Sequence, residues 1–207
     1  MLPALINRNA KKERTKKMKK ALGAIPAIFP MPVLMVAAYD ENGKVNVMNA
    51  AWGMISDMKQ ITLFLSEDHK TTANILATKA FTVALADKDH MDVADFFGIA
   101  TGNTMKDKFE RTGFAAVKSA FVNAPVIDEF PVVMECELEQ VIENDTFYAI
   151  VGTIINTSAE ESVLDENGKI EPAKVNALIF DQFKFGYYTI GEKVGQAWNA
   201  GKEWMKK

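Results

Sequence analysis

Cysteine and histidine are scarce in this sequence. Its 207 residues include one cysteine, Cys136, and two histidines, His69 and His90. A single cysteine excludes an internal disulfide and a metal site built from several thiolates. The two histidines lack the short spacing of a metal-binding pair. The sequence therefore predicts no metal centre.

Long apolar runs are also missing. No stretch reaches the roughly 18 consecutive apolar residues that a membrane-spanning helix needs. The basic N-terminal stretch is not followed by the apolar block and small residues of a secretory signal. We therefore expect a cytoplasmic protein with no membrane partner.

Familiar catalytic motifs are absent as well. The sequence contains no G-x-S-x-G elbow, no P-loop and no G-x-G-x-x-G after a predicted strand. No residue stands out as a catalytic nucleophile or base. Any chemistry is therefore expected to come from a bound cofactor.

Charge is distributed unevenly along the chain. Residues 1–20 hold eight basic residues and one acidic residue, and the other 187 residues carry a net charge of -10. An acidic body argues against nucleic acid as a partner. We expect a basic arm over residues 1–20 and a single domain over residues 21–207. The arm is most simply a solvated extension, and binding to RNA or an acidic lipid surface is the alternative.

Apolar residues recur with a period of two over much of the domain, which is typical of strands. This pattern predicts strands at residues 33–39, 45–51, 60–65, 81–86, 131–142 and 147–156. Residues 174–179 and 185–190 are expected to close the sheet, and Asn42-Gly43 predicts a tight hairpin turn. Short helices are expected after Thr71 or Thr72 as N-cap, at residues 91–97 and 105–112, and in the tail from residue 192. The sequence thus predicts a mainly β protein, an antiparallel barrel with a few short helices.

Cys136 lies in a predicted strand in which apolar residues alternate with glutamates over residues 134–139. The alternation places the thiol on the apolar face. A small buried hydrophobic side chain is the simpler interpretation. A redox-active thiol is the alternative.

Two segments have the character of a ligand site. His69-Lys70-Thr71-Thr72 precedes a helix, where a lysine, two hydroxyls and free N–H groups can hold a phosphate; an ordinary helix cap is the alternative. Residues 48–53 place small side chains before Trp52 and Gly53, so a flat ligand can press against the backbone; a strand end with a core tryptophan is the alternative.

The order of short motifs along the chain resembles the flavin reductase-like family of FMN-binding split barrels, and within it the flavoredoxin branch. The motifs, over about residues 18–201, are Lys19-Lys20-Ala21-Leu22-Gly23, Pro30-Met31-Pro32-Val33, Tyr39-Asp40, Asn46-Val47-Met48-Asn49-Ala50-Ala51-Trp52-Gly53, Asn74-Ile75, Asp95-Phe96-Phe97-Gly98, Asp107-Lys108-Phe109, Glu129-Phe130-Pro131 and Tyr187-Tyr188. The resemblance implies a six-stranded antiparallel split β-barrel. It also implies a homodimer with FMN near the subunit interface.

The resemblance further implies which residues bind FMN. One group would line the isoalloxazine ring, with Trp52 near its dimethylbenzene end: Met48, Asn49, Ala50, Ala51 and Trp52. A second group would hold the ribityl phosphate: Ser66, Lys70, Thr71, Thr72 and Asn74. Lys108 would approach the flavin, from the same subunit or from its partner.

The family also implies a redox function, for which two hypotheses remain open. FMN would carry electrons from NAD(P)H to a flavin or another acceptor, or the protein would exchange electrons with a protein redox partner and not use NAD(P)H. Many family members have histidine in the hairpin where this chain has Phe147, and that departure favours the electron carrier. A binding module without redox activity is a third possibility, since fold does not fix function.

Overall fold

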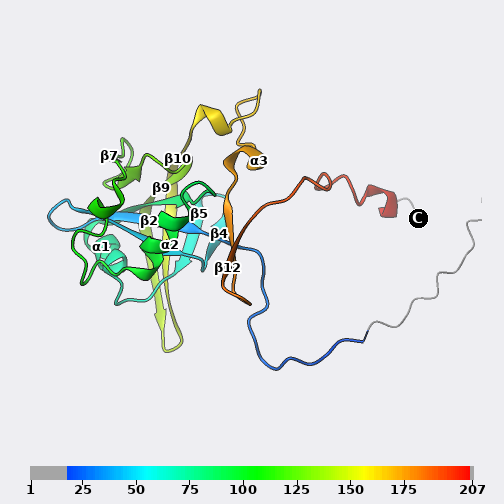
Figure 1. The fold of residues 1–207 in the computed structure, drawn as a ribbon, viewed down its shortest axis with the longest axis horizontal. Coiled ribbons are helices and arrows are strands. Elements are labelled where there is room, and N and C mark those ends of the chain that lie inside the picture. Colours follow the sequence, from blue (N-terminus) through cyan, green and yellow to red (C-terminus); the bar gives the residue numbers. More distant parts are fainter. Residues whose placement is uncertain (1–17, 206–207) are drawn as a thin grey trace, which may run out of the picture.

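A computed structural model describes residues 18–205, so most of the predicted basic arm, residues 1–17, lies outside the described residues, as do residues 206–207. The centre of the fold is a curved, antiparallel, seven-stranded sheet with the strand order β3-β2-β6-β9-β10-β5-β4 (Figure 1). Its strands are β2 (Leu34–Tyr39), β3 (Val45–Ala50), β4 (Gly53–Asp57), β5 (Gln60–Phe64), β6 (Ala80–Leu85), β9 (Val132–Asn144) and β10 (Phe147–Ala159). Six of them are the six predicted strands.

The seventh strand, β4, was not predicted. It pairs with β5 through a bulge between Ile55 and Asp57, and its side chains are mostly exposed. An exposed edge strand lacks the alternation of buried and exposed residues that identifies strands in a sequence. The predicted turn between β2 and β3 is confirmed: Gly43 has a φ of 77°, and the Asp40 carboxylate accepts N–H bonds from Asn42 and Lys44.

Strand β2 is buried on both faces and separates two apolar cores. Val33, Met35 and Ala37 belong to one core, whereas Leu34, Val36 and Ala38 belong to the other. Helix α2 (Met91–Ile99) packs into the first core and helix α1 (Lys70–Thr78) into the second. Burial of each large apolar side chain contributes about 1.5–3 kcal/mol, so this strand fixes both helices against the sheet.

Cys136 lies in the second core and is fully buried. Burial, together with the neighbouring Glu135 carboxylate, raises the pKa of the thiol to about 12. The interpretation as a small buried hydrophobic side chain is confirmed. The alternative of a redox-active thiol is not supported, because the thiolate is the reactive form.

The remaining strands form two small sheets. β1 (Met31–Pro32), β11 (Leu178–Asp181) and β12 (Gly186–Thr189) form one, and β7 (Ala116–Lys118) pairs with β8 (Pro125–Ile127) in the other. The expectation that residues 174–190 close the main sheet was therefore wrong. Pro172 begins a short helix, α3 (Pro172–Val175), and the left-handed Asn176 ends it, so the strand starts only at Leu178. Proline at the first helical turn favours this arrangement.

Three predicted helical features differ from the structure. Residues 105–112 form turns and one 3-10 helix, η1 (Glu110–Thr112), because Gly113 in the left-handed region ends it. The N-cap of α1 is His69, and both threonines lie inside the helix. The tail is largely irregular and ends in the 3-10 helix η3 (Lys202–Met205), and its Val194 and Trp198 side chains are almost fully exposed. A further 3-10 helix, η2 (Glu161–Val163), precedes α3.

Both ends of the described chain leave the folded body. Residues 18–30 and residues from about 190 onward run away from the sheets on the same side of the molecule (Figure 1). Most of these residues are exposed. Within residues 18–205, no helix has the length and apolar character required to cross a membrane.

Candidate functional site

Strand β3 joins two helices through polar side chains. The Asn46 amide donates to the Thr71 hydroxyl in α1 over 2.6 Å, and the Asn49 amide donates to the Ala94 carbonyl in α2 over 3.0 Å. β3 also ends the order of strands in the main sheet. An edge strand leaves half of its backbone N–H and C=O groups without a strand partner. The strand therefore offers polar backbone groups beside two anchored helix ends.

Helix α1 begins without a cap. His69 has extended backbone angles and makes no side-chain cap bond, and the first turn contains no acidic residue. The first N–H groups of a helix have no partner within the helix and carry a partial positive charge. Lys70, the first helical residue, adds a full charge. Together they form a positive, hydrogen-bond-donating helix end.

Two buried polar atoms near this end lack partners. Within the described residues, the Nδ1 atom of His69 and the Nδ2 atom of Asn74 are buried and make no hydrogen bond. A buried polar group without a partner costs about 1–3 kcal/mol. In contrast, the Thr72 hydroxyl donates to the Ser66 carbonyl over 2.8 Å and holds the loop that leads into the helix. The N-cap residue and the second turn of α1 thus contain buried polar atoms that the described residues leave without a hydrogen bond.

Lys108 caps the C-terminus of the other helix, α2. Its side chain is 4% exposed, and its ammonium group donates to the Phe97 carbonyl over 3.0 Å and to the Ala100 carbonyl over 2.7 Å, at the C-terminus of α2. A cation is stabilised by the partial negative charge there. Burial nevertheless lowers the pKa of Lys108 to about 8, because desolvation disfavours the charged form.

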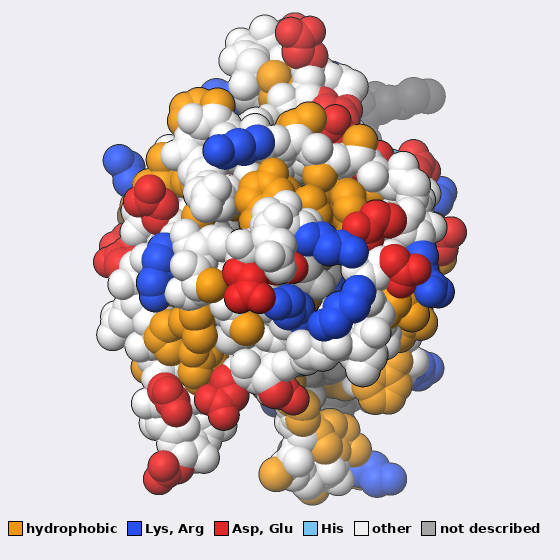
Figure 2. Space-filling view, turned by 90° about the vertical axis from the view of Figure 1, so that its left-hand side faces the viewer, with side chains coloured by type: hydrophobic (Ala, Val, Ile, Leu, Met, Phe, Trp, Pro, Cys, Tyr) orange, Lys and Arg blue, Asp and Glu red, His pale blue; other side chains and the backbone are white. Residues whose placement is uncertain are grey.

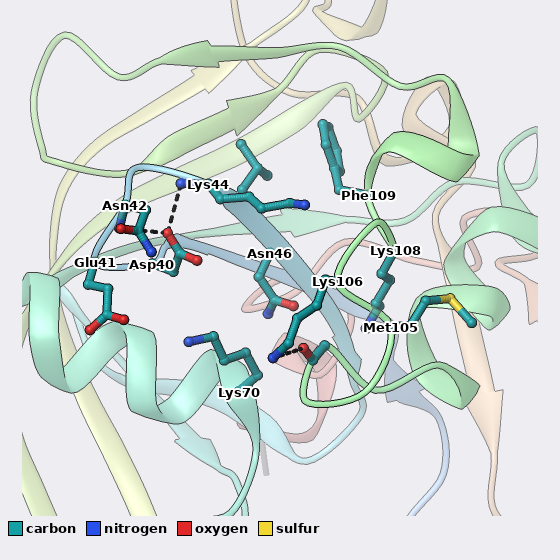
Figure 3. Close-up of a pocket in the computed structure, with 12 residues that line it drawn as sticks. Asp40, Glu41, Asn42, Lys44, Asn46, Lys70, Met105, Lys106, Lys108 and Phe109 are labelled. Carbon is teal, nitrogen blue, oxygen red and sulfur yellow. Dashed lines mark hydrogen bonds between the residues drawn. The ribbon is translucent and has the colours of Figure 1, made fainter.

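The pocket in Figure 3 lies between these parts and has a volume of about 210 Å³. It is lined by the turn after β2, the start of α1 and the loop that contains Lys106 and Lys108. Lys70 and Lys106 extend into it, and Lys44 pairs with Glu110 at 3.0 Å. The face in Figure 2 likewise carries basic and acidic side chains close together. The pocket is thus lined by both acidic and basic side chains.

Five predicted site residues meet in an adjoining cavity of about 110 Å³. They are Met48, Asn49, Lys70, Thr71 and Lys108. Gly102 stands between the two pockets, where a Cβ atom would overlap with the Asn46 side chain. Only glycine therefore permits the loop to approach β3 so closely.

The other predicted residues lie at the end of β3 and just after it, in the loop before α1, and within α1. Trp52 and Ser66 line a pocket of about 400 Å³ together with Phe64 and Phe147, and Ala51 and Trp52 line a larger apolar groove. Ala50 belongs to the core of the barrel. Thr72 and Asn74 are buried inside α1. Trp52 is 58% exposed, so the interpretation as a core tryptophan is wrong.

Sequence reasoning missed three residues at the site: Asn46, Gly102 and Tyr187. The Tyr187 hydroxyl donates a hydrogen bond to the Asp95 carboxylate over 2.9 Å. Burial, and to a smaller extent this hydrogen bond, raises the pKa of Tyr187 to about 12. Asn46 could have been noticed as a polar residue on an otherwise apolar strand face. Tyr187 was noted only as part of a family motif, and neither Tyr187 nor Gly102 could be placed at the site from its neighbours in the sequence, because their contacts join distant parts of the chain.

Comparison with known proteins identifies the family. Residues 27–187 match the model of the flavin reductase like domain. The structure resembles the flavoredoxin of Desulfovibrio vulgaris (Miyazaki F), with 33% identity, coverage of 89% of this chain and 100% of that chain, and a TM-score of 0.85. A flavoredoxin from Methanosarcina acetivorans is 26% identical, with coverage of 91% and 100% and a TM-score of 0.83.

A curated relative from Aquifex aeolicus (strain VF5), named an uncharacterized protein, is 25% identical over 161 residues, which are 73% of this chain and 80% of that protein. The family model spans more than half of the chain. The predicted mainly β split-barrel fold is confirmed by the likeness to the flavoredoxin structures. The chain belongs to the flavin reductase like domain family, with flavoredoxins among the proteins that it resembles.

Proposed function

We propose that this protein binds FMN along β3 and acts as a redox protein of the flavoredoxin type. The observation that carries the proposal is the uncapped N-terminus of α1 beside Lys70. This end supplies N–H donors and positive charge to a phosphate. The unpaired His69 Nδ1 atom adds a polar group that a ligand can satisfy. Membership of the family and the flavoredoxin relatives support the same cofactor.

The residues present fit the two halves of FMN. Ser66, Lys70 and Thr71 are proposed to hold the phosphate, with Thr72 and Asn74 supporting the loop and helix behind them. Met48, Asn49, Ala50, Ala51 and Trp52 are proposed to line the isoalloxazine ring through backbone contacts. The small side chains at positions 50 and 51 and the open backbone edge of β3 suit a flat ligand.

Bound FMN supplies hydride and electron transfer. The protein contributes binding, orientation and electrostatics, so the proposal assigns no catalytic side chain. Lys108 is held by two carbonyls of α2 and keeps a cation beside the cleft below pH 8. We propose that this charge favours the bound anionic cofactor.

The proposal also concerns the electron donor, for which there are two candidates. NAD(P)H is one candidate, with a flavin or another small acceptor receiving the electrons. Phe147 favours the second candidate, a protein redox partner, because the ring is 42% exposed and packs edge-on against Phe64 at 5.8 Å. An apolar ring offers no hydrogen bond to a nicotinamide. The acidic body suits docking with a basic partner, in the cytoplasm that the sequence predicts.

Anaerobic spectroscopy tests the proposal. The purified protein is expected to bind FMN and to show flavin absorption bands. Bleaching by NADH or NADPH would assign the reductase function, and bleaching by dithionite without any response to NAD(P)H would assign the electron carrier. A protein that fails to bind added FMN would refute both.

We also propose that the protein is a homodimer. The described chain exposes large apolar side chains around the groove beside Trp52, including Met54 and Ile55 in β4. Contiguous apolar patches of this kind mark protein interfaces. Light scattering on the purified protein measures the mass directly, and a monomer at micromolar concentration would contradict this proposal.

A further inference from the structure

Two segments of this chain expose apolar side chains to water. In the C-terminal segment, residues 190–205, Val194 is 97% exposed and Trp198 is 94% exposed. In the N-terminal segment, residues 18–30, Ile28 is 75% exposed. Figure 1 shows both segments running outward from the same side of the molecule. Exposure of such apolar side chains to water is unfavourable, and exposed apolar surfaces often mark sites that another protein surface covers.

The body carries a groove of matching character. It has a volume of about 590 Å³ and lies between residues 26–32 and β4. Its walls are formed almost entirely by apolar side chains, among them Met31, Leu34, Met54, Ile55 and Phe64. β4 ends the order of strands in the main sheet, so its outer backbone groups are also open for pairing.

We propose that, in the homodimer, residues 190–205 of each copy lie in this groove of the other copy. The C-terminal segment leaves β12 and runs away from its own body (Figure 1). If fully extended, its 16 residues would reach at most about 50 Å, which is enough to reach across a neighbouring domain of this size. Its two acidic and two basic residues, Glu192, Glu203, Lys193 and Lys202, nearly cancel in charge, which suits an apolar surface.

A second copy is the occupant that explains both features together. Each chain carries one groove and one C-terminal segment, residues 190–205, so a two-fold symmetric pair covers both grooves and both C-terminal segments at once. An exposed 16-residue segment presents about 2,500 Å² to water. Covering half of that in each of two segments exceeds the 1,200–2,000 Å² of a standard interface. The exchange therefore supplies enough contact for a stable dimer.

The exchange also places the partner's C-terminal segment beside the proposed isoalloxazine site. Ala51 and Trp52 line the groove, and the same residues are proposed to face the isoalloxazine ring. The partner's C-terminal segment therefore closes the Trp52 end of the cleft. This last consequence rests on the proposed function, whereas the exchange itself does not.

Disulfide trapping between two differently tagged chains tests the exchange. The native Cys136 is buried with a pKa of about 12, so introduced cysteines are the reactive thiols. Asn199→Cys, beside Trp198 on the C-terminal segment, in one full-length chain and Ile55→Cys in the other are co-expressed and oxidised. We expect a disulfide that joins the two tagged chains. The matched control replaces Ile55→Cys by Lys169→Cys, on an exposed turn outside the groove, and should give little product.

Three results would overturn the exchange. One is equal trapping with the Lys169→Cys control, and a second is no trapping with Ile55→Cys. The third uses both substitutions in one chain: a disulfide that leaves the protein monomeric on a non-reducing gel would mean that the segment folds back into its own groove.

Equilibrium measurements provide an independent readout. Trp198→Ser in the full chain should weaken dimerisation at least about 30-fold, the effect of losing one dominant interface aromatic residue. Lys193→Ser is the matched control and should change it less than about threefold. An unchanged dissociation constant in Trp198→Ser would contradict the exchange. FMN titration of the same proteins separates the proposals: binding without trapping refutes only the exchange, and trapping without binding refutes only the proposed function.

Discussion

The C-terminus of α2 and the N-terminus of α1 lie near each other beside β3, but only the first of them is capped by a side chain. The C-terminus of α2 is closed by a lysine of the same chain, since Lys108 donates to the carbonyls of Phe97 and Ala100. The N-terminus of α1 has no side-chain cap and no acidic residue in its first turn. A helix end that serves only the fold gains stability from a cap. This contrast supports the proposal that one end is structural and that the other binds a ligand.

We expect the largest effect, on the free energy of unfolding, when the lysine cap at the C-terminus of α2 is removed. Lys108→Met keeps an unbranched side chain but leaves two carbonyls without their donor. Hydrogen bonds to charged groups contribute about 1.5–3 kcal/mol, so we expect a loss of about 2–3 kcal/mol in the free energy of unfolding. Urea denaturation measures it. Lys118→Met, on the exposed strand β7, is the control, and equal stability of the two variants would contradict the structural role.

The same lysine predicts a dependence on pH. Its pKa is about 8 in the folded protein and 10.5 as the ordinary value, so between these values the unfolded chain binds more protons. The free energy of unfolding of the native protein should therefore rise with pH in this window, relative to Lys108→Met. Denaturation below and within the window measures the difference. A difference that falls with pH would show that the folded state holds the proton more tightly.

At the uncapped N-terminus of α1, we expect a substitution to weaken FMN binding without lowering the stability of the fold. Lys70→Met removes a charge from the proposed phosphate site, and we expect FMN affinity to fall about tenfold, or about 1.4 kcal/mol. The loss should shrink at high salt, because salt screens an exposed charge. Flavin fluorescence titration at two ionic strengths measures it. Lys118→Met again serves as control, and equal affinity of both variants would exclude Lys70 from the site.

The smallest expected effect comes from closing the open end. His69→Asp places a carboxylate at the N-cap of α1, where a capping side chain stabilises by about 1 kcal/mol. The thermal midpoint should rise while FMN affinity falls, because the carboxylate competes for the same N–H groups. His69→Asn caps the helix without a charge and should weaken binding less. A variant that gains stability and retains full affinity would place the phosphate elsewhere.

The sequence predicted the sheet well because burial follows a simple period there. The six predicted strands are present, and the alternation along β2 separates two cores. It failed where the backbone depends on a single turn residue, as at Asn176, where the left-handed conformation ends α3. It also failed in the tail, where the helical spacing of residues such as Val194 and Trp198 has no folded surface of the same chain to match.

The site was predicted in part, for a related reason. Lys70, Thr71, Met48, Asn49 and Lys108 meet in one cavity, and local motifs had marked each of these segments. Gly102 packs against Asn46, which lies far away in the sequence. The Tyr187–Asp95 pair likewise joins β12 to α2. Such contacts arise from the tertiary fold, so motifs that contain one partner, such as those with Asp95 and Tyr187, do not reveal the pair.

A comparison of FMN with riboflavin tests the central claim most directly. The two ligands share the isoalloxazine ring and the ribityl chain and differ by the phosphate alone. If the open end of α1 and Lys70 hold that phosphate, the native protein binds FMN at least about a hundredfold more tightly, and Lys70→Met reduces the ratio. Equal affinity for both ligands would contradict the claim that the helix end is kept open for a phosphate.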